Sequence, residues 1–164
     1  MTALAPEATR PAAGTVRRLQ ALAVAGWPFG RLARESGLTP YRINQMLTEA
    51  PATVTADEAR AVAAVYARYS GASPGLCGVS HIHARAARDR ATAAGWAPPA
   101  AWDDDTIDDP DAIPQWTGHC GTARGADIHA RRDIPLCPAC QAADERRRLA
   151  REARALRALS TTRA

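Results

Sequence analysis

The sequence predicts a mainly α-helical protein made of two small modules. Three observations lead to this expectation. Apolar residues recur at helical spacing between Gly and Pro breakpoints along most of the chain. Aromatic residues make up only 5% of the 164 residues, so helices must pack mainly through Leu, Val and Ala. A stretch rich in Cys and His near the C-terminus indicates a small segment that is held by a metal ion.

The first module is expected over residues 15–70, after a flexible Ala- and Pro-rich arm over residues 1–14. Its first helix ends at Gly26, and its second begins near Pro28 and ends before Gly37. Thr39 can cap a third helix that has Pro40 at its first position. A capping box at residues 55–58 begins the fourth.

Residues 71–118 are expected to form a loop, a helix over residues 80–94 and an acidic segment rich in Trp and Pro. Disordered acidic linkers rarely contain large apolar side chains. We therefore expect five apolar residues of this segment to dock it onto the helices: Trp96, Trp102, Ile107, Ile113 and Trp116. The last part, residues 119–164, is expected to hold a zinc knuckle that leads into a long basic helix.

Residues 29–48 match the spacing of a helix-turn-helix. Ala33 is small where two helices would cross closely, and Gly37 can supply the positive φ of the turn. In such a motif the N-terminal half of the second helix enters the DNA major groove. The expected DNA contacts are Thr39, Pro40, Tyr41, Arg42, Asn44 and Gln45. Arg42 can donate to guanine, and Asn44 or Gln45 to adenine. The competing interpretation is a plain helical hairpin in a bundle.

Two stretches, GWPFGRLARESGLTPYRINQML and GWAPPAAWDDDTIDDPDAIP, resemble small helix-turn-helix proteins of actinobacteria and their phages. With the helix between them, they span roughly residues 15–116. This resemblance implies DNA binding and transcriptional regulation, with the recognition helix over residues 39–47. It carries no known target sequence.

The C-terminal stretch contains the pattern Cys120-x8-His129-x7-Cys137-x2-Cys140. Three thiolates and one imidazole complete a tetrahedral zinc site and leave no open position, which indicates a structural ion. His119 could replace His129 as a ligand. The stretch CGTARGADIHARRDIPLCPAC also resembles a short module of actinobacterial proteins with the form CGTxxGxxxHxR followed by CxxC, which is similar to a zinc knuckle.

The Cys, His and Asp residues have other interpretations. The CxxC pair could be metal-free or redox-active, although no βαβ pattern surrounds it. Cys77 stands alone, and an iron–sulfur site would need it as a distant ligand. His81 and His83 have no ligand partner at suitable spacing. The six aspartates of residues 103–111 are better explained as a solvated acidic loop, partly paired with Arg, than as a magnesium site.

The net charge of +4 comes from 21 basic residues, all of them Arg, against 17 acidic residues. Basic character favours an anionic partner, and we expect Arg10, Arg17, Arg18 and the Arg-rich residues 146–157 to contact phosphates. The sequence lacks a signal-peptide pattern and a stretch of about 18 apolar residues, so we expect a cytoplasmic protein without membrane contact.

These observations favour a non-enzymatic, sequence-specific regulator of transcription that binds double-stranded DNA. Proteins of this type often bind as dimers, so a homodimer is an expected form. One alternative is a zinc-supported nuclease of the HNH type, although no Asn or second His follows His119 at useful spacing. Another is a non-enzymatic adaptor whose basic C-terminal helix binds a protein.

Overall fold

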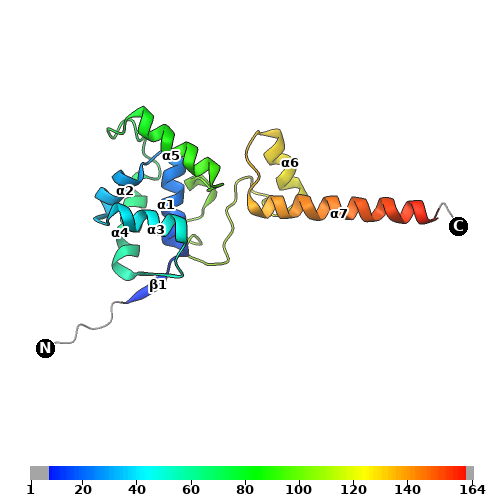
Figure 1. Cartoon of the computed structure of the whole chain (residues 1–164), viewed down its shortest axis with the longest axis horizontal. Coiled ribbons are helices and arrows are strands. Elements are labelled where there is room, and N and C mark those ends of the chain that lie inside the picture. Colours follow the sequence, from blue (N-terminus) through cyan, green and yellow to red (C-terminus); the bar gives the residue numbers. More distant parts are fainter. Residues whose placement is uncertain (1–7, 162–164) are drawn as a thin grey trace. The chain divides into compact units, whose positions relative to one another are not determined.

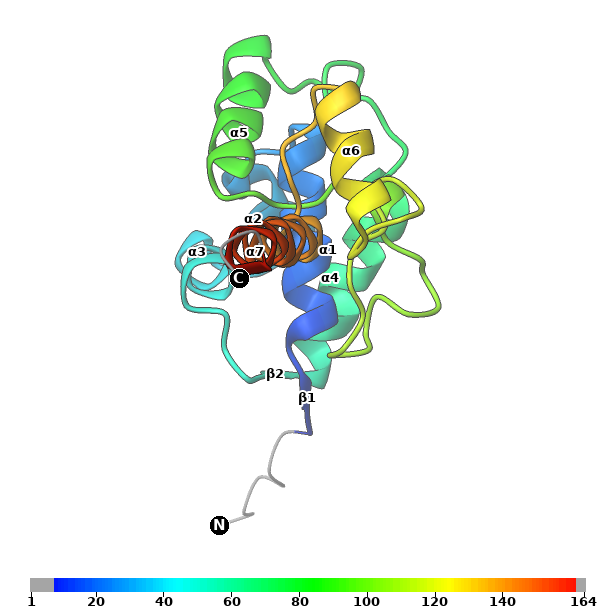
Figure 2. The same ribbon diagram turned by 90° about the vertical axis from the view of Figure 1, so that its right-hand side faces the viewer.

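The computed structural model describes residues 8–161, and within this range it is mainly helical (Figures 1 and 2). The described chain divides into two compact units, one ending at Ala112 and the other beginning at Ile113. The first unit contains β1 (Thr9–Pro11), α1 (Ala13–Ala25), α2 (Phe29–Ser36), α3 (Pro40–Glu49), β2 (Thr53–Thr55), α4 (Ala56–Tyr69), α5 (His81–Ala93) and the short 3-10 helix η1 (Pro99–Ala101). The second contains α6 (Ala123–Arg131) and α7 (Pro138–Thr161).

Helix α1 is the centre of the first unit, where it contacts α3, α4, α5 and η1 (Figure 2). Its inward face is mainly apolar, and Leu19 and Leu22 have no exposed surface. The core around it is completed by Trp27, whose ring centre lies 4.4 Å from that of Tyr69. The helical spacing of apolar residues therefore gives the bundle that the sequence predicts.

Part of the expected flexible arm is ordered. Residues 1–7 lie outside the described residues, but β1 pairs antiparallel with β2, with Thr9 opposite Thr55 and Pro11 opposite Thr53. Helix α1 then begins at Ala13, two residues earlier than expected. A three-residue strand has no sequence signal of its own, because its hydrogen-bond partner lies more than forty residues away.

The acidic segment docks onto the first unit, as expected, but only up to Ala112. Ile107 is completely buried, and Trp96 and Trp102 pack against the core. Ile113 is 47% exposed, and Trp116 packs in the second unit beside the cysteines. The boundary that the sequence placed at residue 118 therefore differs from the observed division after Ala112.

The Arg17 side chain of α1 binds the backbone of this acidic segment. Its guanidinium donates to the carbonyl oxygens of Ile107, Pro110 and Ala112 at 2.9 Å each, and also to that of Asp109. It also lies over the ring of Trp102, 4.8 Å from the ring centre. A guanidinium offers five donors in a fixed plane, which suits several carbonyls at once.

We expect Arg17→Ala to lower the free energy of unfolding by about 1.5–3 kcal/mol, the usual range for a hydrogen bond to a charged group. Chemical denaturation followed by Trp fluorescence measures this loss, because Trp96 and Trp102 report on the docked segment. The matched control is Arg85→Ala, whose exposed ion pair with Asp89 contributes at most about 1 kcal/mol. Equal losses in the two variants would contradict this role for Arg17.

Candidate functional site

Four side chains of the second unit converge on one point. The ligand atoms of Cys120, His129, Cys137 and Cys140 all lie within 4.8 Å of one another, and all four residues are buried. Cys120 lies in the loop before α6, His129 on α6, and the last two at the start of α7. His119, the alternative ligand, is exposed and outside this group. These four ligand atoms are close enough to one another to form a candidate metal site.

The local fold around this site depends on close contacts between the loop and α6. Thr122 caps α6 by accepting a hydrogen bond from the Gly125 amide at 3.1 Å, and its hydroxyl donates to the His119 carbonyl at 2.7 Å. A Cβ atom at Gly125 would lie 2.2 Å from that carbonyl oxygen and 2.9 Å from the Cys140 sulfur. Only glycine allows α6 to approach the loop and the ligands this closely.

A second feature of this site is the hydrogen bonding of the buried His129 imidazole. Its side chain is completely buried, yet neither ring nitrogen has a hydrogen-bond partner among the described residues. Leaving a buried polar group unpaired costs about 1–3 kcal/mol. The ring of Trp116, with its centre 5.9 Å away, covers the imidazole but offers no acceptor. A cation bound by one of these nitrogens removes part of that cost, so the residues fit a metal ion.

The pKa values of Cys120 and Cys137 are shifted in opposite directions. Burial alone raises the pKa of Cys120, but the nearby His129 ring and the Thr117 hydroxyl outweigh burial and bring it to about 7. Burial raises the pKa of Cys137 to about 12, and the neighbouring Cys140 and Cys120 contribute to the rise. Buried thiols this close cannot all ionise without a cation. Metal binding, which requires thiolates, resolves this conflict.

The helices α2 and α3 have the interior that the sequence predicts. Leu32, Ile43 and Met46 are completely buried, and Ala33 is 2% exposed. Gly37 ends α2 with φ at 72°, a left-handed conformation that glycine adopts without strain. Thr39 caps α3 by accepting a hydrogen bond from the Arg42 amide at 3.1 Å.

Four of the six expected DNA contacts lie on the surface of the first unit. Thr39, Pro40, Tyr41 and Asn44 are exposed, and Tyr41 keeps 74% of its surface accessible. A large aromatic side chain so exposed at the start of a helix contributes nothing to the core. These residues form a polar face over the N-terminal half of α3.

Arg42 and Gln45 have different surroundings from those expected of base contacts. The Arg42 guanidinium donates to both carboxylate oxygens of Glu58, at 2.6 and 2.9 Å, and to the side-chain oxygen of Gln45 at 2.7 Å. Gln45 in turn donates to Glu49. The hydrogen bond from Arg42 holds the pKa of Glu58 below its ordinary value. Arg42 therefore joins α3 to α4, and its guanidinium is already occupied.

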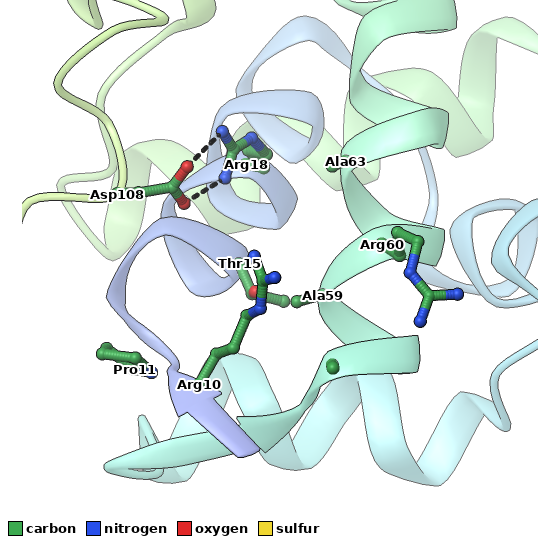
Figure 3. A pocket seen from close by; sticks show the side chains of 9 residues that line it. Arg10, Pro11, Thr15, Arg18, Ala59, Arg60, Ala63 and Asp108 are labelled. Atoms are coloured by element: carbon green, nitrogen blue, oxygen red, sulfur yellow. Dashed lines mark hydrogen bonds and ion pairs between the residues drawn. The ribbon is translucent and has the colours of Figure 1, made fainter. Parts of the chain in front are cut away.

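Two of the arginines expected to contact phosphates also bind other groups of the protein. Arg17 binds the backbone of the acidic segment, and Arg18 pairs with both oxygens of Asp108. The pair borders a hollow of about 280 Å³ between β1, α1 and α4 (Figure 3). A Cβ at Gly14 would lie 2.8 Å from the Asp108 Cα, so glycine permits this approach. Arg10 lines the same hollow and stays exposed.

The basic residues are unevenly distributed along the chain. Residues 113–164 contain ten arginines against five acidic residues, whereas residues 1–112 contain eleven against twelve. The net charge of +4 is thus contributed by the second unit. The net charge of the whole chain does not show this contrast, although the charges counted for each module do.

Over residues 8–161, no helix combines the length and apolar character that crossing a membrane requires. Comparison of the chain with protein-family models, with curated proteins and with solved structures finds no match.

Proposed function

We propose that this protein binds double-stranded DNA in a sequence-specific manner and regulates transcription, with α2, the Gly37 turn and α3 acting as a helix-turn-helix. One observation carries this proposal. The N-terminal half of α3 exposes polar and aromatic side chains, while Ile43 and Met46 on its other face are completely buried. A helix supported in this way can enter the major groove without disturbing the core behind it.

The base contacts are assigned to Asn44 and Tyr41, and the positioning of the helix to Arg42. Asn44 is exposed and can bind adenine through both atoms of its amide. Tyr41 can contact a phosphate through its hydroxyl or a thymine methyl through its ring. Arg42 fixes the orientation of α3 on α4 through Glu58. This assignment replaces the expectation that Arg42 binds guanine.

The Cys3His cluster is proposed to hold one structural zinc ion. Thiolate and imidazole ligands suit zinc, and four protein ligands leave no position for a substrate or a reactive water. When bound, the ion supplies a link between the loop, α6 and the start of α7. Its role in the proposed function is to keep the basic unit folded.

Binding affinity and specificity are proposed to come from different units. The residues around α3 can distinguish bases, but the first unit has no net positive charge to attract DNA. The second unit has an excess of five arginines over acidic residues. Phosphate contacts contribute most of the sequence-independent affinity of DNA-binding proteins.

Selection of bound duplexes from a random pool tests the proposal. We expect enrichment of one motif, which then binds in a gel shift in the presence of excess random duplex. If the protein binds as a homodimer, the motif has two half-sites about one helical turn apart. A pool without an enriched motif would contradict sequence-specific binding. Degradation of the probe on addition of metal would instead support a nuclease.

A further inference from the structure

The second unit contains a basic groove of about 410 Å³ beside the metal site. It is lined by Thr117, His119, Arg124, Ile128, Arg131 and Arg132. Arg124, Ile128 and Arg131 recur at intervals of four and three residues, so they lie along one face of α6. Thr117 and His119 come from the preceding loop. The groove is thus lined by three guanidinium groups from α6 and its C-terminal end, and by a hydroxyl and an imidazole from the preceding loop.

Among the described residues, no carboxylate lines this groove. Asp127, the acidic residue of α6, is bound by Arg147 of α7 at 2.7 Å. Asp133 follows Arg132 in the chain but is not among the lining residues and forms no ion pair with an arginine among the described residues. The charge of the three arginines is therefore not balanced inside the groove.

The arginines in the first half of α7, by contrast, have hydrogen-bond or ion-pair partners within the protein. Arg146 donates to the Gly121 carbonyl, Arg147 pairs with Asp127 and Asp144, and Arg148 pairs with Glu145 and Glu152. Arg124 and Arg132 have no such partner among residues 8–161, and Arg131 has only a long 3.4 Å bond to a backbone carbonyl. The groove therefore carries unbalanced positive charge, whereas the arginines at the start of α7 have partners within the protein.

We propose that this groove binds phosphate groups of the DNA backbone and supplies a main part of the sequence-independent affinity. Guanidinium groups bind phosphate oxygens through paired hydrogen bonds, and the Thr117 hydroxyl and the His119 ring add further polar contacts. The metal cluster keeps the two walls together, because Cys120 follows the loop wall and His129 belongs to α6. The inference rests on the proposed DNA-binding function and assigns its phosphate contacts to α6.

The test uses the full-length metal-loaded protein and the triple variant Arg124→Gln, Arg131→Gln, Arg132→Gln. Affinity for a duplex of arbitrary sequence is measured as a function of salt concentration. Each lost phosphate contact lowers the magnitude of the log–log slope by about 0.9, so we expect a decrease of about 2–3. Metal content and helicity, measured on the same samples, show that the variant is folded.

The matched control is Arg60→Gln, Arg85→Gln, Arg148→Gln, which removes the same charge at positions that are paired with exposed carboxylates. We expect its slope to stay within about 1 of the wild-type value. An unchanged slope in the α6 variant, or an equal decrease in both variants, would overturn the assignment of phosphate contacts to this groove.

A second probe separates this inference from the proposed function. Inorganic pyrophosphate is titrated into the protein while the side-chain Nε signals of arginine are followed by NMR. We expect shifts of Arg124, Arg131 and Arg132, and none of Arg85. If pyrophosphate shifts these signals but no duplex binds, the anion site stands and the DNA-binding function fails. If duplex binds with motif preference while the α6 variant keeps its slope, the function stands and the groove assignment fails.

Discussion

Replacement of Cys137 by Ser, or removal of metal with a chelator, is expected to unfold the second unit and leave the first unit folded. The buried cluster of the second unit consists of Cys120, Ala126, Cys137 and Cys140, with Trp116 and Ala139 packed against it. Three of its four buried members are candidate metal ligands, so little apolar area stabilises α6 and α7 without an ion. Zinc binding contributes about 10–16 kcal/mol in isolated zinc-finger peptides, far more than this cluster can replace.

The measurements are elemental analysis, which should find one zinc per chain, and circular dichroism, which should show the helicity of α6 and α7 lost on chelation. Trp27, buried in the first unit, should keep its environment. The matched control is Cys77→Ser, a half-buried residue of the first unit that lies outside the cluster. An unchanged zinc content in Cys137→Ser, or a folded second unit in metal-free protein, would contradict the prediction.

Substitutions at three consecutive residues of α3, Arg42, Ile43 and Asn44, are expected to have three different effects. Ile43→Ala removes a completely buried side chain from the core and should lower the free energy of unfolding by about 2–5 kcal/mol. It should weaken binding to all duplexes alike, because the helix itself loses its support. Urea denaturation and gel shifts with selected and random duplexes measure the two effects.

Asn44→Ala is expected to act only on recognition. The side chain is exposed, so the free energy of unfolding should change by less than about 0.5 kcal/mol. Binding to the selected motif should weaken by about 1–3 kcal/mol, the usual value of a paired contact with a base, and binding to random DNA should not change. A variant that binds the motif as well as the wild type would exclude Asn44 as a base contact.

Arg42→Ala separates positioning from base contact. It leaves Glu58, whose side chain is only 15% exposed, without its cation. The expected loss of unfolding free energy is about 1–2 kcal/mol, between the values for exposed and buried ion pairs. Both Arg42→Ala and Glu58→Gln should weaken binding to the selected motif, because either change removes the ion pair that joins α3 to α4. Glu58 itself is not on the proposed DNA face. If Arg42→Ala weakens motif binding with no effect on stability and Glu58→Gln has no effect on binding, Arg42 is a base contact after all.

The ends of the helices could be predicted from the sequence because their signals are local. Gly26 and Gly37 end α1 and α2 in the left-handed conformation, and Thr39 and Thr55 accept the capping hydrogen bonds at the starts of α3 and α4. Each of these signals acts over three or four residues. The capping box at Glu58 is confirmed in full, with both of its hydrogen bonds present.

The metal ligands could be predicted for a related reason. Cys137 and Cys140 belong to one tight turn, and Cys120 and His129 lie less than twenty residues away, so the chain can bring all four together without help from the first unit. The group of neighbouring ligand atoms includes His129 and not His119, as expected. Gly125, which permits the close approach of α6, is a fixed position of the CGTxxGxxxHxR pattern, but the pattern alone does not show which atoms the glycine packs against.

The amino-acid sequence was thus enough to predict α1–α5, α7 and the residues of the candidate metal site, but it did not predict α6. Only the tertiary structure decided which arginines are occupied: Arg17 and Arg18 bind groups more than eighty residues away, and Arg42 binds Glu58 on the next helix. A guanidinium at the end of a long side chain pairs with whichever oxygen the fold brings near it. The sequence records the charge of each arginine, but only the packed helices determine whether that charge is balanced within the protein or faces solvent.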